Sequence, residues 1–159
     1  MTQKITPMLW FDNQAEEAMN FYTSVFKDSE VLEVSRYGEG GPGLAGSVMV
    51  ASFKLNGSQF TALNGGPHFK FTEAISFVID CGDQDEVDYY WNALTADGGE
   101  ESQCGWLKDK FGLSWQVTPR ILSELLGDKN PAKAGAAMQA MLQMKKIEIP
   151  KLKEAFDNA

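Results

Sequence analysis

The fold is decided by residues 9–26, LWFDNQAEEAMNFYTSVF, because a weaker copy follows 68 positions later at residues 77–94, FVIDCGDQDEVDYYWNAL. Asp12 and Tyr22 are identical to their counterparts Asp80 and Tyr90, and the aligned core positions keep their apolar or aromatic class. Each copy predicts a short apolar strand that ends at an acid, followed by an amphipathic helix that ends in a double aromatic. We expect a ligand site where two such halves meet.

Three further strands are predicted in the first half. A first strand over 5–11, mostly apolar, is expected to be buried on both faces, and Asp12 or Asn13 is expected to cap the helix that follows. The later strands are predicted over 31–37, 47–55 and 58–64, with the dipeptide Asn56-Gly57 as a hairpin turn.

The second half repeats this order. A strand is predicted over 74–79, then a helix capped by Asp83 and ended by Gly98-Gly99, then strands over about 99–103, 106–108 and 113–117. The predicted order is therefore βαβββ twice, in modules of about 1–66 and 72–119. Together they are expected to form one α+β domain over 1–119.

The pattern becomes helical after Pro119, which predicts a C-terminal helical extension over 120–159. Asn130-Pro131 is a typical helix start, and a last short helix is predicted over 150–156. Several methionines fall at helical spacing on the face that holds Met138 and Met141. Such a stripe is usually core or subunit interface, and the sequence leaves both open.

The charge of the chain argues against nucleic acid as a partner. The net charge is −8, yet residues 129–159 hold six lysines against three acids, so the rest of the chain is strongly acidic. An acidic surface repels phosphate backbones. The basic segment can dock on an acidic surface of this chain or of a partner subunit, or be a solvated helix face.

Nothing in the sequence predicts a membrane or secreted protein. No apolar run approaches the roughly 18 residues that span a bilayer, and the first residues lack a hydrophobic signal core. Cys81 and Cys104 have neither metal-site spacing nor the density of a disulfide scaffold. We therefore expect a cytoplasmic protein with reduced thiols.

Five stretches in order carry a resemblance to a known family: residues 5–11, 15–22, 64–77, 105–119 and 138–149. With the duplicated βαβββ pattern they resemble the PhnB-like proteins, also labelled the 3-demethylubiquinone-9 3-methyltransferase family. This group lies in the vicinal oxygen chelate superfamily, which includes glyoxalase I, extradiol dioxygenases and bleomycin-resistance proteins. The resemblance implies two half-barrels forming a cup that binds a small molecule, and a homodimer.

Metal-using members of the superfamily hold a divalent ion through the first and last strands of each half, which implies positions in this chain. The first falls within Ile5-Thr6-Pro7, which offers no good ligand. The others offer Glu73, Asn64 and Gln116, of which only Glu73 is a carboxylate. We therefore predict no cofactor and no native metal centre, with Glu73 and Gln116 as weak candidate ligands.

The candidate ligand-binding residues are Gln116, Asn64, His68, Phe69 and Trp106. Gln116 can bond a ligand inside the cup or be an interior amide satisfied by a neighbouring strand. His68, the single histidine, lies in a glycine-rich loop and can be a general base or a histidine stacked on aromatic neighbours. Alternation along the last strand makes Trp115 and Gln116 point to opposite faces.

Four functions stay open. The leading hypothesis is a PhnB-like protein that binds a small, partly apolar molecule, with any catalysis independent of metal. The alternatives are a metal-dependent glyoxalase or dioxygenase, the methyltransferase of the family label, and an antibiotic-sequestering protein. The glycine-rich segment 38–43 lies between two predicted antiparallel strands with no helix after it, so it does not support a typical methyl-donor site.

Overall fold

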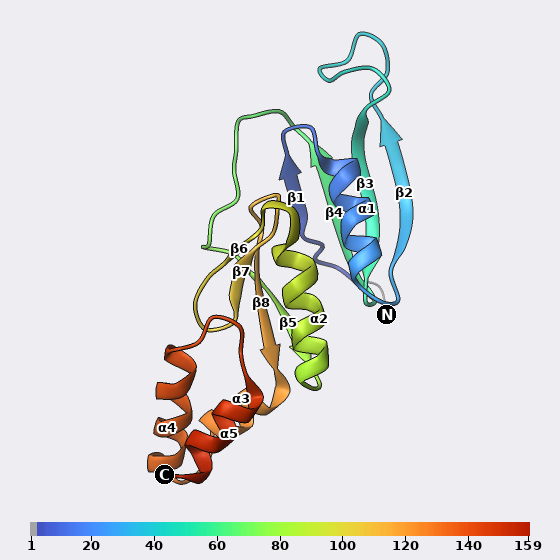
Figure 1. Ribbon diagram of the computed structural model, residues 1–159. Helices are drawn as coiled ribbons and strands as arrows, with labels where there is room; N and C mark the ends of the chain where they lie inside the picture. The colour runs from blue at the N-terminus through green and yellow to red at the C-terminus, as the bar shows by residue number, and fades with distance from the viewer. Residues whose placement is uncertain (1–2) are drawn as a thin grey trace. The chain divides into compact units, whose positions relative to one another are not determined.

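The computed structural model describes residues 3–159, which divide into two units between Phe71 and Thr72 (Figure 1). The first unit has the order β1 (Met8–Phe11), α1 (Ala15–Val25), β2 (Glu30–Arg36), β3 (Val48–Leu55) and β4 (Ser58–Asn64). The second repeats it with β5 (Phe77–Cys81), α2 (Gln84–Thr95), β6 (Glu100–Glu101), β7 (Trp106–Lys108) and β8 (Ser114–Pro119). The predicted α+β fold of two βαβββ modules is confirmed.

The two sheets have the same topology. Their strand orders are β1-β4-β3-β2 and β5-β8-β7-β6. In each sheet the first strand pairs in parallel with the last strand, and the other neighbours are antiparallel. The connection between the two parallel strands contains the helix and the other two strands, which gives it the length that a parallel crossover needs.

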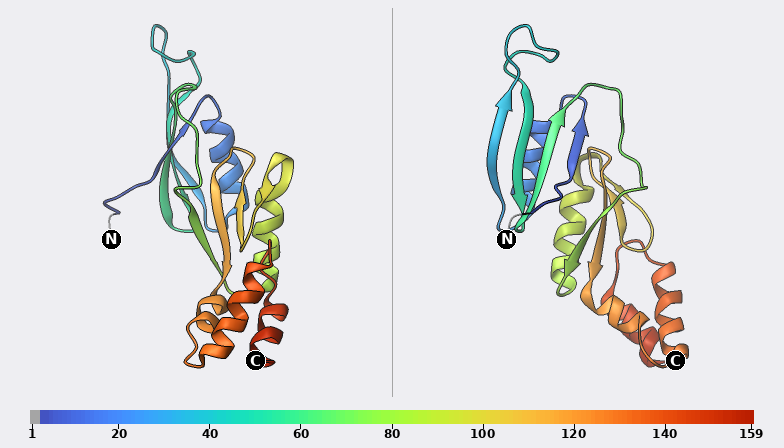
Figure 2. Two further views of the ribbon diagram at one scale, coloured as in Figure 1. Left: turned by 90° about the vertical axis from the view of Figure 1, so that its left-hand side faces the viewer. Right: turned by 180° about the vertical axis from the view of Figure 1, so that it is seen from behind.

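Each sheet packs one face against the helix of its own unit (Figure 2). In the first unit the α1 side chains Ala18, Met19 and Tyr22 are buried, and so are Leu9 and Phe11 of β1. The helix therefore meets alternate residues of each strand, and the residues between them lie on the other face of the sheet.

The first strand differs from its prediction. β1 begins at Met8, not Ile5, and the Ile5 side chain is 87% exposed. Pro7 has no N–H to add to the ladder, although its carbonyl accepts a hydrogen bond from the Thr61 N–H. The expectation that this strand is buried on both faces is wrong, because only Leu9 and Phe11 are buried.

The predicted cap of helix α2 is confirmed, and the predicted cap of helix α1 is wrong. The Asp83 side chain accepts a hydrogen bond from the Glu86 N–H at 2.9 Å, so the predicted cap of α2 is confirmed. The residue before α1 is Gln14, which makes no side-chain cap bond. The prediction of Asp12 or Asn13 there is wrong, because the Ala15 N–H instead donates to the Asn64 Oδ1 atom.

The predicted helical extension consists of three helices after the second sheet: α3 (Arg120–Leu126), α4 (Pro131–Leu142) and α5 (Ile149–Asp157). Asn130 caps α4 through the N–H groups of Ala132 and Lys133. The helices share a core of buried apolar side chains, namely Leu122, Leu125, Ala137, Met144, Ile147 and Leu152.

The segment between α4 and α5 is joined by main-chain hydrogen bonds to the residues just before β7. The N–H groups of Cys104 and Gly105 donate to the carbonyls of Met144 and Lys145 at 2.8 and 2.7 Å. Gly105 has φ +85°, and a Cβ there would lie 3.0 Å from the Val117 carbonyl oxygen, so only glycine suits this close approach.

No helix within residues 3–159 combines the length and the apolar character needed to cross a lipid bilayer.

Candidate functional site

The second sheet has one face turned away from helix α2, which we call the uncovered face. Its residues follow from the strand register, in which Val78 and Trp106 flank Gln116, and Lys108 pairs with Ser114. The neighbouring positions Trp115 and Val117 are buried on the side of α2, whereas Val78 is 61% exposed. The uncovered face is defined by Val78, Trp106, Lys108, Ser114 and Gln116.

Gln116 lies at the middle of this face. Its Nε2 atom donates a hydrogen bond to the Ser76 Oγ atom at 3.0 Å, and its side chain is half-buried. Trp115 points to the opposite face, as the alternation predicts, and stacks at a tilt on Phe77 with ring centroids 5.6 Å apart. The half-buried amide is therefore held by a neighbouring residue yet remains at the surface of the sheet.

The turn before β8 sets the direction of these side chains. Asp109, which is buried, accepts hydrogen bonds from the N–H groups of Phe111 and Leu113 at its Oδ1 atom. Its Oδ2 atom accepts the indole N–H of Trp115 at 2.9 Å. One carboxylate thus holds both the turn and the indole, which places the next residue, Gln116, on the uncovered face.

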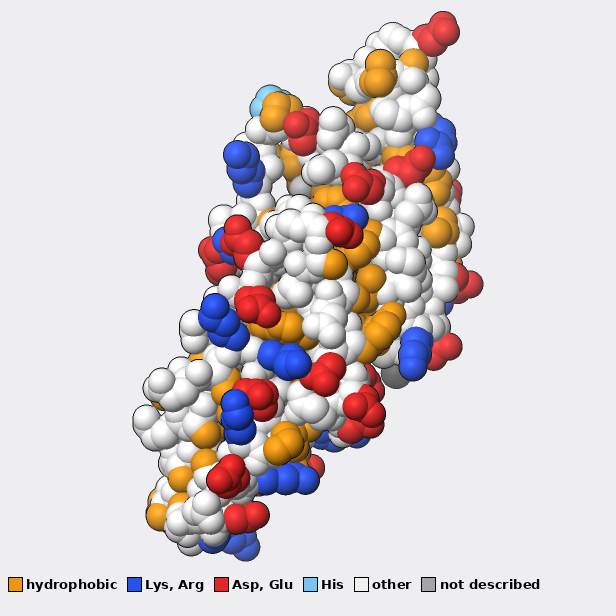
Figure 3. All heavy atoms as spheres, viewed as in Figure 1, with side chains coloured by type: hydrophobic (Ala, Val, Ile, Leu, Met, Phe, Trp, Pro, Cys, Tyr) orange, Lys and Arg blue, Asp and Glu red, His pale blue; other side chains and the backbone are white. Residues whose placement is uncertain are grey.

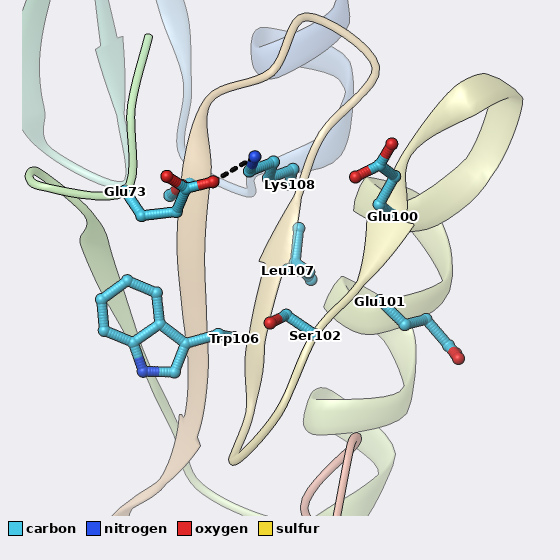
Figure 4. A pocket seen from close by; sticks show the side chains of 8 residues that line it. Glu73, Glu100, Glu101, Ser102, Trp106, Leu107 and Lys108 are labelled. Carbon is cyan, nitrogen blue, oxygen red and sulfur yellow. Dashed lines mark ion pairs between the residues drawn. The ribbon is translucent and has the colours of Figure 1, made fainter.

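An ion pair crosses the edge of the uncovered face between Lys108 and Glu73. Hydrogen bonding to the Lys108 ammonium holds the pKa of the Glu73 carboxyl below its usual value, and the same contact raises the pKa of Lys108. Figure 4 shows the two side chains turned toward each other. Both groups are therefore charged at neutral pH.

A pocket of about 160 Å³ lies beside β6 and β7. It is lined by Glu73, Glu100, Glu101, Ser102, Trp106, Leu107, Lys108 and Ser114 (Figure 4). The Ser114 residue is 1% exposed, and its Oγ atom has no hydrogen-bond partner. A buried hydroxyl without a partner costs about 1–3 kcal/mol, which a bound polar group or water can relieve.

Asn64 has a structural role in the first unit. It is 8% exposed, its Oδ1 atom accepts the Ala15 N–H at 2.8 Å, and its Nδ2 atom donates to the Val48 carbonyl at 2.9 Å. A ligand that used this amide would have to displace one of two buried hydrogen bonds. The sequence could not foresee this role, because the partners lie 49 and 16 positions away.

His68 and Phe69 lie together in the loop after β4, within the first unit. Both are exposed, and the Phe69 ring meets the Trp10 indole edge-on with centroids 4.9 Å apart. The Trp10 Nε1 atom donates to the Gly66 carbonyl, and Gly65 leaves room for the indole, since a Cβ there would lie 2.3 Å from the ring. Trp10 therefore anchors the loop that presents His68 and Phe69.

The residues expected at the metal-ligand positions do not suit a divalent ion. Asn64 and Gln116 are neutral and bonded to neighbours, and Glu73 is paired with Lys108. No three His, Cys, Asp or Glu side chains of residues 3–159 are grouped so that they could hold one ion.

Cys81 is a poor nucleophile. Burial, followed by the negative charges of Glu86 and Asp80, raises the pKa of its thiol to about 12. The thiol is therefore protonated at neutral pH, and only a thiolate attacks efficiently.

Solved structures with this duplicated fold include proteins of the glyoxalase and bleomycin-resistance type. A glyoxalase/bleomycin resistance protein from Albidiferax ferrireducens is 12% identical and covers 72% of this chain and 96% of its own, with a TM-score of 0.50. The fosfomycin resistance protein FosX from Listeria monocytogenes, whose structure holds manganese(II) and sulfate, is 14% identical and covers 72% and 87%, also with a TM-score of 0.50. At these identities the likeness shows the fold alone.

The family match is more specific than the likeness of fold. The 3-demethylubiquinone-9 3-methyltransferase family matches residues 3–118, so this chain belongs to that family. A putative 3-demethylubiquinone-9 3-methyltransferase, PhnB protein, from Bacillus cereus is 42% identical and covers 74% of this chain and 99% of its own, with a TM-score of 0.69. A search of curated proteins gave no match.

Two of the candidate ligand-binding residues, Gln116 and Trp106, lie on the uncovered face, whereas Ser114 and Lys108 lie there too and were not among the candidates. The signal was present, because Ser114 lies two residues before Gln116 in one strand and so shares its face. The pairing of Lys108 with Ser114 could not be predicted, because it depends on the register between β7 and β8.

Proposed function

We propose that this chain binds a small, partly apolar molecule on the uncovered face of its second sheet. Gln116 is the polar anchor, and Trp106 and Val78 supply apolar contact. The observation that carries the proposal is a sheet with one face packed on a helix and the other bearing a 61% exposed valine beside a half-buried amide. Ligand sites are typically apolar surfaces with a few placed polar groups.

The partner predictions extend this proposal. We propose a homodimer, as the family resemblance implies, and residues 1–119 as one paired-module domain to which 120–159 are an extension. On the face seen in Figure 3, acidic and basic side chains are interspersed, which supports a small-molecule partner over nucleic acid. Light scattering on the purified chain measures the oligomeric state.

Methyl transfer is a second candidate because the matched family bears that name. The glycine-rich segment 38–43 joins β2 to β3, which are antiparallel, and the methyl-donor turn of a doubly wound sheet would instead join a strand to a helix. Calorimetry with S-adenosylmethionine tests this candidate, and absence of heat at millimolar donor would count against it.

A thermal-shift screen over small neutral, cationic and anionic compounds, including antibiotics, tests the leading proposal. A compound that raises the melting temperature is then titrated against Gln116→Ala and Trp106→Ala. Each variant should weaken binding by about threefold to tenfold, which corresponds to the free energy of one lost contact. Gln139→Ala, an exposed amide on α4, is the matched control. Binding that neither site variant weakens would contradict the proposal.

A further inference from the structure

The chain contains two Asn-Gly dipeptides, Asn56-Gly57 and Asn64-Gly65, which are chemically the same but lie in different surroundings. Asn56 and Gly57 are exposed and form the turn between β3 and β4, whereas Asn64, the last residue of β4, is 8% exposed. Glycine has no side chain to hinder the attack of its own nitrogen on the amide of the asparagine before it. The surroundings of the reacting atoms therefore decide which of the two pairs reacts.

Both reacting groups of the Asn64-Gly65 pair are held by hydrogen bonds. The side-chain amide of Asn64 is fixed at both ends, by the Ala15 N–H at 2.8 Å and by the Val48 carbonyl at 2.9 Å. The Gly65 N–H, which carries the attacking nitrogen, donates to the Phe11 carbonyl at 2.8 Å. An attack would break all three hydrogen bonds, so this pair reacts only when the first unit opens.

The Asn56-Gly57 pair lacks this protection. Among the described residues 3–159, the Asn56 side chain and the Gly57 N–H make no hydrogen bond, since the ladder of β3 and β4 ends at the pair of Leu55 with Ser58. A Cβ at Gly57 would have no neighbouring atom within 4 Å. Local opening of this exposed turn therefore brings the two reacting groups together without the loss of any hydrogen bond of their own.

We propose that Asn56 is a site of spontaneous covalent modification, namely deamidation through a succinimide. The Gly57 nitrogen loses its proton to solvent and attacks the Asn56 Cγ atom, the bond from Cγ to Nδ2 breaks, and ammonia leaves. Water then adds to either carbonyl of the ring, which gives aspartate or isoaspartate at position 56. The net change consumes one water and releases one ammonia, with no oxidant or reductant. This inference concerns the first unit and does not depend on the ligand face proposed for the second.

Isoaspartate at position 56 would change the shape of the hairpin as well as its charge. Asn56 and Gly57 have φ +49° and +84°, the left-handed conformations that this two-residue turn requires. Isoaspartate passes the main chain through the side-chain methylene, so the loop becomes longer than the closing pair of the ladder allows. Two positions further along the ladder Phe53 pairs with Phe60, and their rings stack with centroids 6.1 Å apart. The modification should therefore destabilise the β3–β4 hairpin.

The two dipeptides can be compared within one peptide. Trypsin cuts after Lys54 and Lys70, and residues 55–70 contain no other lysine or arginine before that end, so both asparagines lie in the same fragment. Folded protein kept in mildly alkaline buffer should gain the mass of deamidation at Asn56 at least about tenfold faster than at Asn64. The same protein unfolded in urea should react at similar rates at both positions. Equal rates in the folded protein, or no reaction at Asn56 while the unfolded protein reacts, would overturn the inference.

Asn56→Gly is the matched control for the effect on the hairpin. Glycine adopts the positive φ of the turn and has no side-chain amide to react. Anion exchange separates the modified wild type, which carries an additional negative charge. Its melting temperature should lie about 2–4 °C below that of the unmodified protein, whereas Asn56→Gly should keep its starting value after the same incubation. A modified wild type that melts as the unmodified protein does, or an equal loss in Asn56→Gly, would overturn the link between the modification and the hairpin.

Discussion

The Oδ1 atom of Asn64 lies 2.8 Å from the backbone N of Ala15 and accepts its hydrogen bond, so the last residue of β4 caps helix α1. The same side chain donates from Nδ2 to the Val48 carbonyl at the start of β3. A single amide therefore joins one helix and two strands. Asn64 therefore has a structural role, and the ligand contact that its position in the family pattern suggested stays a prediction.

Replacing Asn64 tests that task. Asn64→Ala removes two buried hydrogen bonds and leaves the Ala15 N–H without its acceptor, so we expect a loss of about 2–4 kcal/mol in unfolding free energy. Urea denaturation followed by circular dichroism measures it. Asn13→Ala, at the position where the sequence predicts the cap, should change stability by less than about 0.5 kcal/mol. A larger effect at Asn13 than at Asn64 would reverse our assignment of the cap.

Asp109 should be among the most sensitive polar positions of the second unit. Asp109→Ala leaves three donors without their acceptor, the N–H groups of Phe111 and Leu113 and the Trp115 indole, and should cost about 3–5 kcal/mol. Trp115→Phe removes only the indole donor, and the two backbone bonds to Asp109 should survive. If Asp109→Ala unfolds at the same urea concentration as the wild type, the turn does not depend on this carboxylate.

The two cysteines should react at different rates. Burial and nearby carboxylates raise the pKa of Cys81 to about 12, whereas Cys104 is partly exposed. Native protein at pH 8 should therefore react quickly with iodoacetamide at Cys104, and Cys81 should react only after denaturation. Mass spectrometry of the labelled peptides counts the modified thiols. The Cys104→Ser variant is the control and should stay unlabelled while folded; rapid labelling of Cys81 in it would contradict the prediction.

Replacing Gln84 should weaken the attachment of the segment between α4 and α5 to helix α2. Its Nε2 atom donates to the Ile147 carbonyl at 3.0 Å, and its Oε1 atom accepts the Ile149 N–H at 2.7 Å. Gln84→Ala should speed tryptic cleavage near Lys145 and Lys146, measured by mass spectrometry over time. Gln139→Ala, on exposed α4 surface, should leave the cleavage rate unchanged. Equal rates in both variants would show that Gln84 does not hold the segment.

The docking of that segment should also depend on pH. A hydrogen bond from Lys146, and then one from Gln84, lowers the pKa of the Asp88 carboxyl. Because the folded pKa lies below the unfolded value of about 3.9, this contact stabilises the fold above that value and is lost as pH falls through the folded pKa. The stability difference between the wild type and Asp88→Asn should therefore be present at pH 6 and shrink below about pH 4. A difference that stays constant across this range would rule out the ion pair as its source.

Local sequence signals predicted much of this molecule. The repeated strand and helix pattern, the Asp83 and Asn130 caps and the Asn56-Gly57 turn involve residues close in the chain, so composition and spacing predict them directly. The predicted start of β1 at Ile5 is wrong because the burial of Ile5 depends on what packs against it. An apolar run by itself does not say which of its residues find a partner.

The sequence by itself determined two βαβββ modules, a helical C-terminus and the alternation that separates Trp115 from Gln116. These follow from periodicity, which is set by the backbone geometry of neighbouring residues. Only the tertiary structure decided that Asn64 caps a distant helix, that Glu73 pairs with Lys108 and that Ser114 lies buried without a partner beside acidic side chains. Those relations depend on strand register and on contacts across 35 and 49 positions in the chain, which no local pattern records.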